Sequence, residues 1–538
     1  MKNDTDLSLP ISEDFANTAI RSAKQVKLII FALMTGMLLA ALDQTIVATA
    51  LPTIVADLHG ASHLSWVVTA YLLATTVSTP LWGKLGDLYG RKGFFQIAIV
   101  IFLIGSALSG LSNSMIELIS FRALQGLGSG GLIIGATAII GDVASPRERG
   151  KYQGLFGAVF GLASVIGPLL GGVCVEHLSW RWIFYINVPV GAIALVIITK
   201  QVPANLSKIH HTIDYLGALL ITLAATGMVL YTSLGGVSYA WSDPFMVALM
   251  VASIIVAGMF VWVEYKAKEP VLPLHLFNNR TFTVGTIVSF LLGLAMFGSI
   301  VFLPLYFQDA RGASPTISGL DLLPMLVGLV VASIGSGQLI VKTGKYRMYP
   351  IVGTLMMTLG MILFTLIKLD SSSLTIDLYM LIFGFGLGMT LQVVVLAAQN
   401  AAPYKELGAA TSGVTFFRTI GGSFGTAVFG AIFSNVIVSR LKTALPHREL
   451  SSAIATGNVT PSTLSHLPVS IRSAIATTYS SGIHVVFEIA IPLTLAAFIA
   501  ALFLPHIELR KHNIAGAETD NTDASAIGEL QESFDAIF

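Results

Sequence analysis

Charged residues are scarce in this chain of 538 residues. Asp, Glu, Lys and Arg make up 11% of the sequence, against about 25% in soluble globular proteins. Hydrophobic residues make up 54%, which leaves too little polar surface to cover a soluble fold, so the composition indicates a membrane protein. The net charge of +1 provides no polybasic surface, and we expect no nucleic acid partner.

Cysteine is almost absent, and so are the signatures of enzymes. The single Cys174 excludes an intrachain disulfide framework, and its apolar neighbours favour a packing role. No Gly-x-x-x-x-Gly-Lys-Ser/Thr phosphate loop occurs, so the chain should carry no ATP motor of its own. Metal-ligand clusters and catalytic triad spacings are missing as well. We therefore expect no metal, no cofactor and no enzymatic activity.

Long apolar runs take up most of the sequence. Fourteen are long enough to cross a bilayer, and they lie at about 28–52, 65–82, 94–112, 115–140, 152–175, 182–199, 214–234, 245–263, 282–307, 318–341, 348–367, 374–398, 411–438 and 482–504. Helices are favoured over barrel strands because the hydrophobicity is continuous instead of alternating. The first run is too long for a cleaved signal peptide and should stay in the mature protein.

Lys and Arg are spread unevenly among the connections between these runs. With the N-terminus on the cytoplasmic side, 21 of the 30 fall in cytoplasmic segments and seven in outer ones, while Arg122 and Arg418 lie within runs. Cytoplasmic loops of membrane proteins are enriched in Lys and Arg. The distribution predicts an even number of spans and both termini in the cytoplasm, in a cell or inner membrane of bacterial type.

The two ends of the chain share a repeat. An offset of 254 residues aligns Gly83 with Gly337, Gly90 with Gly344, Gly167 with Gly421, and Gly171 with Gly425. The sequence thus predicts an all-α membrane fold of two pseudo-repeated six-helix bundles with two inserted helices. The segments are an N-terminal tail (1–26), a first bundle (27–200), the inserted pair with linkers (201–281), a second bundle with a long outer connection at 439–481 (282–505) and a C-terminal tail (506–538).

Asp43 lies inside the first run, where a charged side chain costs about 2.5–3.5 kcal/mol on insertion scales. We expect it to face a partner or a water-filled cavity. Asp43 lies roughly 14 Å, and Arg122 roughly 10 Å, from the outer ends of their runs at 1.5 Å per residue. Because these depths overlap, the two are predicted to pair and to exchange a proton or a substrate cation. A permanent structural ion pair is the alternative.

Other polar residues within the runs are weaker candidates. Asp321 fits a cation site or a helix cap formed with Ser318, and Glu488 fits proton handling or an interfacial pair with His484. Arg418 fits a functional role or an arginine that reaches toward the membrane surface. The residues considered as lining a cavity are Gln125, Gln392, Gln399 and Phe416.

Two glycine-rich stretches are candidates for conformational change. Gly83 and Gly90 permit a tight turn and close helix approach, and Asp87 and Arg91 supply a charge pair able to break and re-form. In the fifth run, glycines and a proline would let the helix bend and pack closely, and these are Gly167, Pro168, Gly171 and Gly172. An anchoring turn and ordinary packing are the respective alternatives.

These residues resemble known motifs. Gly83-Lys-Leu-Gly-Asp87-Leu-Tyr-Gly90-Arg91-Lys92 is similar to the signature loop of the major facilitator superfamily, and its repeat at 337–347 lacks the aspartate. Further motifs resemble those of the fourteen-helix drug:proton antiporter branch: Leu42-Asp43-Gln-Thr45 with Pro52, Arg122-Ala-Leu-Gln125-Gly126-Leu-Gly128, Gly167-Pro168-Leu-Leu-Gly171-Gly172, and Trp180 to Gly191. The resemblance covers nearly all of residues 28–505.

The resemblance implies a proton-coupled multidrug efflux antiporter with a role in drug resistance. Such a protein would export amphipathic, cationic compounds by alternating access, with Asp43 and Arg122 in proton coupling and the proton gradient as energy source. Its partners would be small amphipathic substrates, protons and the lipid bilayer, and we expect a monomer. The alternatives are an exporter or carrier of one endogenous metabolite or lipid, and a non-transporting membrane receptor.

Overall fold

The computed structural model describes residues 23–58, 64–202, 214–236, 239–313, 315–444, 469–506 and 509. The α-helices are α2 (Ala23–Asp57), α3 (Leu64–Tyr89), α4 (Arg91–Leu111), α5 (Met115–Val143), α6 (Pro146–His177), α7 (Trp182–Tyr185), α8 (Asn187–Gln201), α9 (Tyr215–Leu234), α10 (Pro244–Lys266), α11 (Arg280–Leu305), α12 (Pro315–Asp321), α13 (Leu323–Thr343), α14 (Met348–Phe364), α15 (Ser373–Ala401), α16 (Leu407–Ala444) and α19 (Val469–Leu502). Short helices of other types are η2 (Leu274–Asn278), η3 (Tyr306–Ala310) and η4 (Tyr404–Glu406). The all-α prediction is confirmed.

Each of the fourteen predicted runs coincides with one helix or with two consecutive helices. In the described ranges, twelve helical stretches are long and apolar enough to cross a membrane. The other two runs correspond to α3, whose 26 residues include Lys84 and Asp87, and to α14, which has only 17 residues. Composition and length therefore support twelve spans, and fourteen stays a prediction.

The long outer connection differs from its prediction at both ends. Helix α16 continues to Ala444 and α19 already begins at Val469, so residues 439–444 and 469–481 are helical. Residues 445–468 lie outside the described ranges, as do most of the N-terminal tail and nearly all of the C-terminal tail.

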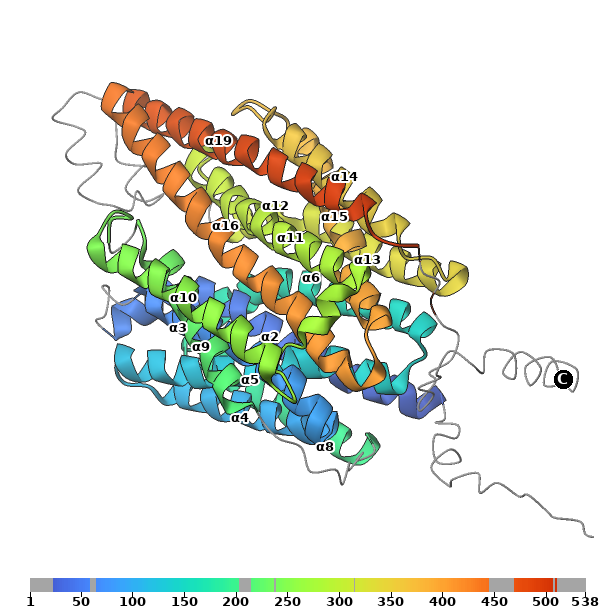
Figure 1. The fold of residues 1–538 in the computed structure, drawn as a ribbon. Helices are drawn as coiled ribbons and strands as arrows, with labels where there is room; N and C mark the ends of the chain where they lie inside the picture. The colour runs from blue at the N-terminus through green and yellow to red at the C-terminus, as the bar shows by residue number, and fades with distance from the viewer. Residues whose placement is uncertain are drawn as a thin grey trace, which may run out of the picture.

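The helices pack by the same plan at the two ends of the chain (Figure 1). In the first half, residues 23–202, α3 and α4 pack on α5, while α2 packs on α6 and α8. In the second half, residues 280–506, α13 and α14 pack on α15, while α11 packs on α16 and α19. Helix pairs at equivalent places in the two halves thus make equivalent contacts.

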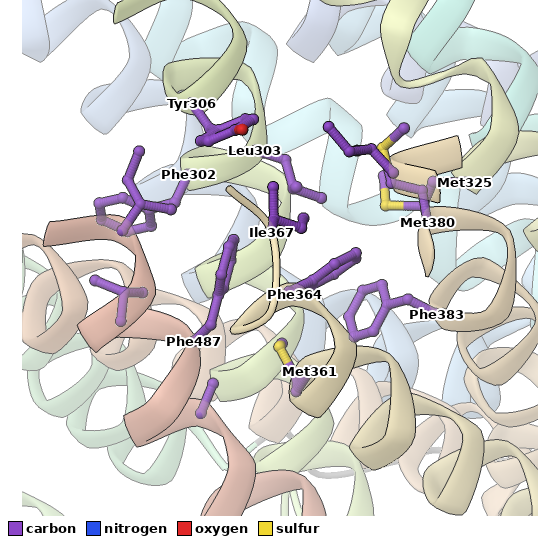
Figure 2. Close-up of a cluster of buried hydrophobic side chains, with 14 of the residues drawn as sticks. Phe302, Leu303, Tyr306, Met325, Met361, Phe364, Ile367, Met380, Phe383 and Phe487 are labelled. Carbon is purple, nitrogen blue, oxygen red and sulfur yellow. The ribbon is translucent and has the colours of Figure 1, made fainter. Parts of the chain in front are cut away.

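A dense aromatic and aliphatic cluster forms the core of the second half. Figure 2 shows side chains from α11, α13, α14, α15 and α19 converging there. The ring of Phe364 lies 5.5 Å from that of Phe383 and 5.2 Å from that of Phe487, measured between centroids. Since all three are buried, this packing joins the consecutive helices α14 and α15 to α19, which follows much later in the sequence.

The two halves meet along α3 with α16 and along α6 with α13. These contacts are tight because small residues line them. A Cβ atom on Gly83 would lie 2.6 Å from the carbonyl oxygen of Gly408, and one on Gly154 would lie 2.4 Å from that of Ser333. We call the end of the molecule with the turns after α3, α5, α13 and α15 the Arg91 end.

The inserted helices α9 and α10 pack against each other and lie beside the first of these contacts (Figure 1, green). Helix α9 touches both α3 and α16. The inserted pair therefore covers one of the two lines along which the halves meet, that of α3 with α16.

Candidate functional site

Asp43 and Arg122 form a buried ion pair. Asp43 lies on α2 and Arg122 on α5, and their side chains are 0% and 1% exposed. The Arg122 Nη1 donates to Asp43 Oδ2. The pairing predicted from their overlapping depths is thus present, and neither residue faces open solvent in this conformation.

Two amide side chains donate hydrogen bonds to the second oxygen of the Asp43 carboxylate. Gln125 Nε2 donates to Asp43 Oδ1 at 2.8 Å, and Asn187 Nδ2 approaches the same oxygen at 3.4 Å. Asn187 also donates to Ser106 Oγ at 3.0 Å. Both carboxylate oxygens are therefore already bonded to the protein, and a substrate cation could reach Asp43 only by displacing one of these donors.

Aromatic rings enclose the guanidinium of Arg122. Its central carbon lies 4.1 Å from the ring centroid of Tyr71 and 5.8 Å from that of Phe184, distances at which a cation is attracted to a ring face. The Tyr71 hydroxyl donates to Ser129 Oγ at 2.7 Å. Weak hydration of the site strengthens its electrostatic interactions, so the charge on Asp43 has a large effect on Arg122.

The glycines of α6 pack directly against α2 just beyond Asp43. A Cβ on Gly167 would lie 1.9 Å from Thr45 Oγ1, and one on Gly171 would lie 2.9 Å from the carbonyl oxygen of Ile46. Gly172 has nothing within 4 Å of such an atom, and Pro168 packs near Gly319 of the other half. Gly167 and Gly171 therefore let α6 approach the helix that carries Asp43.

A second charge cluster lies at the Arg91 end. Arg91 Nη2 donates to Asp87 Oδ1 at 2.7 Å and to the carbonyl oxygen of Tyr404 at 3.2 Å, and Nη1 pairs with Asp142. The Tyr404 hydroxyl donates to Asp142 Oδ1 at 2.7 Å. Because Tyr404 belongs to the second half, this cluster links the two halves.

Asp87 also binds the start of α16. Its carboxylate accepts from the backbone N–H groups of Gly408 at 3.0 Å and Ala409 at 2.9 Å. These amides belong to the first turn of α16, where unpaired N–H groups and the helix dipole favour a negative charge. Gly90 adopts a φ of 98° between α3 and α4, which only glycine takes up readily. The predicted charge pair of Asp87 and Arg91 is thus part of a contact that must break if the halves separate here.

The residues considered as cavity lining are buried in contacts between helices in this conformation. Gln125 belongs to the Asp43 network. Gln399 Nε2 donates to the carbonyl oxygen of Thr137 and to Thr411 Oγ1, so it joins the two halves. Gln392 and Phe416 are also buried, Gln392 against α6 and Phe416 in a cluster shared with α3 and α9. Their polarity or size was visible in the sequence, whereas their place between the halves was not.

Asp321 and Glu488 lie outside the Asp43 network. Asp321 is the last residue of α12 and Ser318 lies within that helix, so the helix-cap alternative is wrong. The Ser318 hydroxyl instead donates to the carbonyl oxygen of Pro304 at 3.1 Å. Glu488 is exposed on α19, while His484 is only partly exposed. Neither carboxylate is part of the Asp43 network in the described ranges.

Several site residues were not predicted. Asn187 appeared only within the motif from Trp180 to Gly191, and Tyr71 was not among the predicted site residues. Asp142 and Tyr404 of the Arg91 cluster were not singled out at all. Amides and tyrosines are common in apolar runs, so their presence alone does not indicate a site. Their partners are known only once the packing of the helices is known.

A separate groove of about 790 Å³ opens at the Arg91 end. It is lined by parts of both halves and of the linker after α10, including Lys84, Glu264, His275, Tyr404 and Glu406. No residue of the Asp43 network lines it. Among the residues that the structure describes, no group of three or more His, Cys, Asp or Glu side chains could hold a metal ion.

Comparisons with known proteins agree with this architecture. The profile described as Major Facilitator Superfamily matches residues 33–426. The chain is 43% identical over 507 residues to an uncharacterized MFS-type transporter of Mycobacterium tuberculosis, covering 93% of this chain and 73% of that one. It is 36% identical over 494 residues to Multidrug resistance protein 3 of Bacillus subtilis, covering 90% and 96%.

The fold also matches the crystal structure of the human organic anion transporter MFSD10, with a TM-score of 0.62 at 14% identity and coverage of 88% and 99%. At this identity the match concerns the fold alone. The family profile, by contrast, spans most of the chain and both charge clusters. The chain belongs to the major facilitator superfamily and is a multi-pass membrane transporter, not an enzyme.

Proposed function

We propose that the protein is a proton-coupled exporter of amphipathic, drug-like compounds that works by alternating access. In this proposal two pseudo-repeated bundles and the inserted pair make fourteen spans, the Arg91 end faces the cytoplasm with both termini, and the unit is a monomer. The names of relatives such as Multidrug resistance protein 3 support the class of substrate. The observation that carries proton coupling is the buried pair of Asp43 and Arg122.

Protonation of Asp43 would remove the charge that holds Arg122 between α2 and α5. The neutral carboxyl group could still accept from Gln125, but Arg122 would be a buried cation without a counter-ion, which is strongly unfavourable. A rearrangement that gives Arg122 water or another acceptor would relieve this. Proton uptake on one side of the membrane and release on the other would thereby favour opposite conformations.

Opening at the Arg91 end would break the contact of Asp87 with α16. A hydrogen bond to a charged group contributes about 1.5–3 kcal/mol. Moving one elementary charge through 100 mV releases about 2.3 kcal/mol. One proton can therefore offset about one such contact, and the binding of substrate must supply part of the remainder.

Cationic selectivity has less support than export itself. The sequence suggested that Asp43 exchanges a proton for a substrate cation. In the structure, however, Arg122, Gln125 and Asn187 occupy both of its oxygens. We therefore propose that Asp43 binds the proton and that other residues select the charge of the substrate.

The test compares Asp43→Asn with Asp57→Asn in proteoliposomes. Both carboxylates lie on α2, but Asp57 accepts from the Trp180 indole at 2.9 Å near the end of the helix. Efflux of a fluorescent amphiphile driven by a pH gradient should be lost in Asp43→Asn, kept in Asp57→Asn and abolished by a protonophore in the wild type. Elution as a monodisperse peak checks folding. Gradient-driven efflux that survives in folded Asp43→Asn would refute the proposal.

A further inference from the structure

Arg418 is a cation within a membrane-spanning helix, and no counter-ion lies beside it in the part of the chain that the structure describes. It lies on α16, eleven residues after the helix begins at Leu407, which places it roughly 16 Å along the helix. Its Nη1 atom is buried without a hydrogen-bond partner. Within the described ranges no carboxylate forms an ion pair with it, in contrast to Arg91 and Arg122.

Helical periodicity places Arg418 on the face of α16 that looks between the halves. Thr411 precedes it by seven residues, close to two full turns, so the two side chains share a face. Thr411 Oγ1 accepts from Gln399 of α15 at 2.9 Å, and Gln399 also donates to the carbonyl oxygen of Thr137 on α5 at 3.1 Å. That face therefore points to the place where α5, α15 and α16 meet.

The helix is less closely packed at the level of Arg418 than before and after it. Residues 411–416 of α16 are all buried, whereas residues 417–419 are partly exposed. Residues 420–422 are buried again. Arg418, with one buried and unpartnered nitrogen, thus lies in a short, partly accessible stretch between two buried stretches of the helix. An arginine side chain reaches only about 6–7 Å from its backbone, less than the roughly 16 Å to the start of α16 at Leu407, so it cannot reach the surface by extending along the helix.

Arg418 and the Asp43 site lie at successive levels between the halves. Along α5, Arg122 lies fifteen residues from Thr137, roughly 22 Å, while Arg418 lies roughly 10 Å beyond the Thr411 level on α16. Every charge at the Asp43 site is balanced within the protein. No described residue balances the charge of Arg418, which faces the region that a compound moving between the halves must pass.

We propose that Arg418 binds an anionic group of the transported compound, in the first place a carboxylate. A guanidinium presents paired N–H donors that match the two oxygens of a carboxylate. Amphipathic anions and zwitterions would then belong to the substrate range, beside the cationic compounds that the family resemblance implies. This inference rests on the proposed export function, since it names the substrates of the same path.

The experiment uses two dyes that differ in one group: rhodamine 110, which has a free carboxylate, and rhodamine 123, its methyl ester. Dissociation constants for purified wild type, Arg418→Gln and Arg418→Lys are measured by fluorescence, and gradient-driven efflux of both dyes is followed in proteoliposomes. Arg418→Gln should weaken binding of the carboxylate dye about tenfold or more, the loss expected for one charge-assisted contact. Binding of the ester should change less than about twofold.

Arg418→Lys keeps the charge but not the paired donors, so an intermediate loss of about threefold or more is expected for the carboxylate dye. It carries the test if Arg418→Gln does not fold. Equal effects on the two dyes, or none, would overturn the role of Arg418. Binding decides this point independently of transport, while a wild type that binds the dyes but moves neither would contradict the export function instead.

Discussion

The ion pair of Asp43 and Arg122 should be visible as a coupling free energy. Asp43→Asn leaves Arg122 at 1% exposure beside neutral polar and aromatic groups, which are Gln125, the carbonyl oxygen of Val67 and the rings of Tyr71 and Phe184. Removing one partner of a buried ion pair costs about 3–5 kcal/mol of the free energy of unfolding. Arg122→Gln should cost a comparable amount at neutral pH, because Asp43 is then a buried carboxylate without a counter-ion.

The double variant leaves two neutral amides and should lose less than the sum of the single variants. We expect a coupling of about 2–3 kcal/mol, near the upper end for residues in direct contact. The assay is equilibrium unfolding in mixed micelles of detergent and SDS, followed by tryptophan fluorescence, for the wild type, both single variants and the double variant.

The pH dependence separates the two single variants. In Arg122→Gln the carboxyl group can be neutralised by a proton, so its loss of stability should shrink as the pH falls. In Asp43→Asn the remaining charge is a guanidinium, which stays protonated at every accessible pH, so that loss should stay constant. Additive single losses, with a coupling below about 0.5 kcal/mol, would mean that the two charges act independently and would refute the buried pair.

Two further predictions concern the contacts around the site. Asp87→Asn removes the charge that binds Arg91 and the start of α16, so the Arg91 end should open more often. The measurement is the rate at which maleimide labels Ser412→Cys in a background without the native cysteine. This rate should rise about five- to thirtyfold, and an unchanged rate would contradict the prediction. Gly167→Val should cost about 1–3 kcal/mol of unfolding free energy because it drives α6 away from the threonine hydroxyl of α2. Gly172→Val, which meets open space, is its matched control and should be nearly neutral, so equal losses in thermal unfolding would refute the packing argument.

The sequence predicted the elements of this fold better than their partners. Apolar runs mark the helices because a bilayer demands continuous hydrophobicity, and the depth of Asp43 and Arg122 followed from residue counts along two runs. Depth alone does not say which faces of two helices meet. Asn187 therefore escaped prediction, although it approaches Asp43 to 3.4 Å.

Some residues make contacts other than those predicted, and the physical reason is the same. Gln399 is polar and lies within a predicted span, which fits a cavity wall and a contact between helices equally well. Only the packing of α5 against α15 and α16 selects the second. Ser318 and Asp321 have the spacing of a helix cap, but α12 begins before Ser318 and ends at Asp321. Here tertiary contacts determine where the helix begins, and they outweigh the local sequence pattern.

The position of α9 has a kinetic consequence. Leu220 and Ile221 of α9 pack in one apolar cluster with Val77 of α3 and Phe416 of α16. Any movement that separates α3 from α16 must also separate α9 from one of these two helices. The apolar surface buried in that contact is then exposed for a time. The inserted pair would then raise the barrier between the two conformations. It would slow the conformational change in both directions and leave the direction of transport unchanged. Its presence would set the turnover rate of the carrier, a property distinct from what it carries or what drives it.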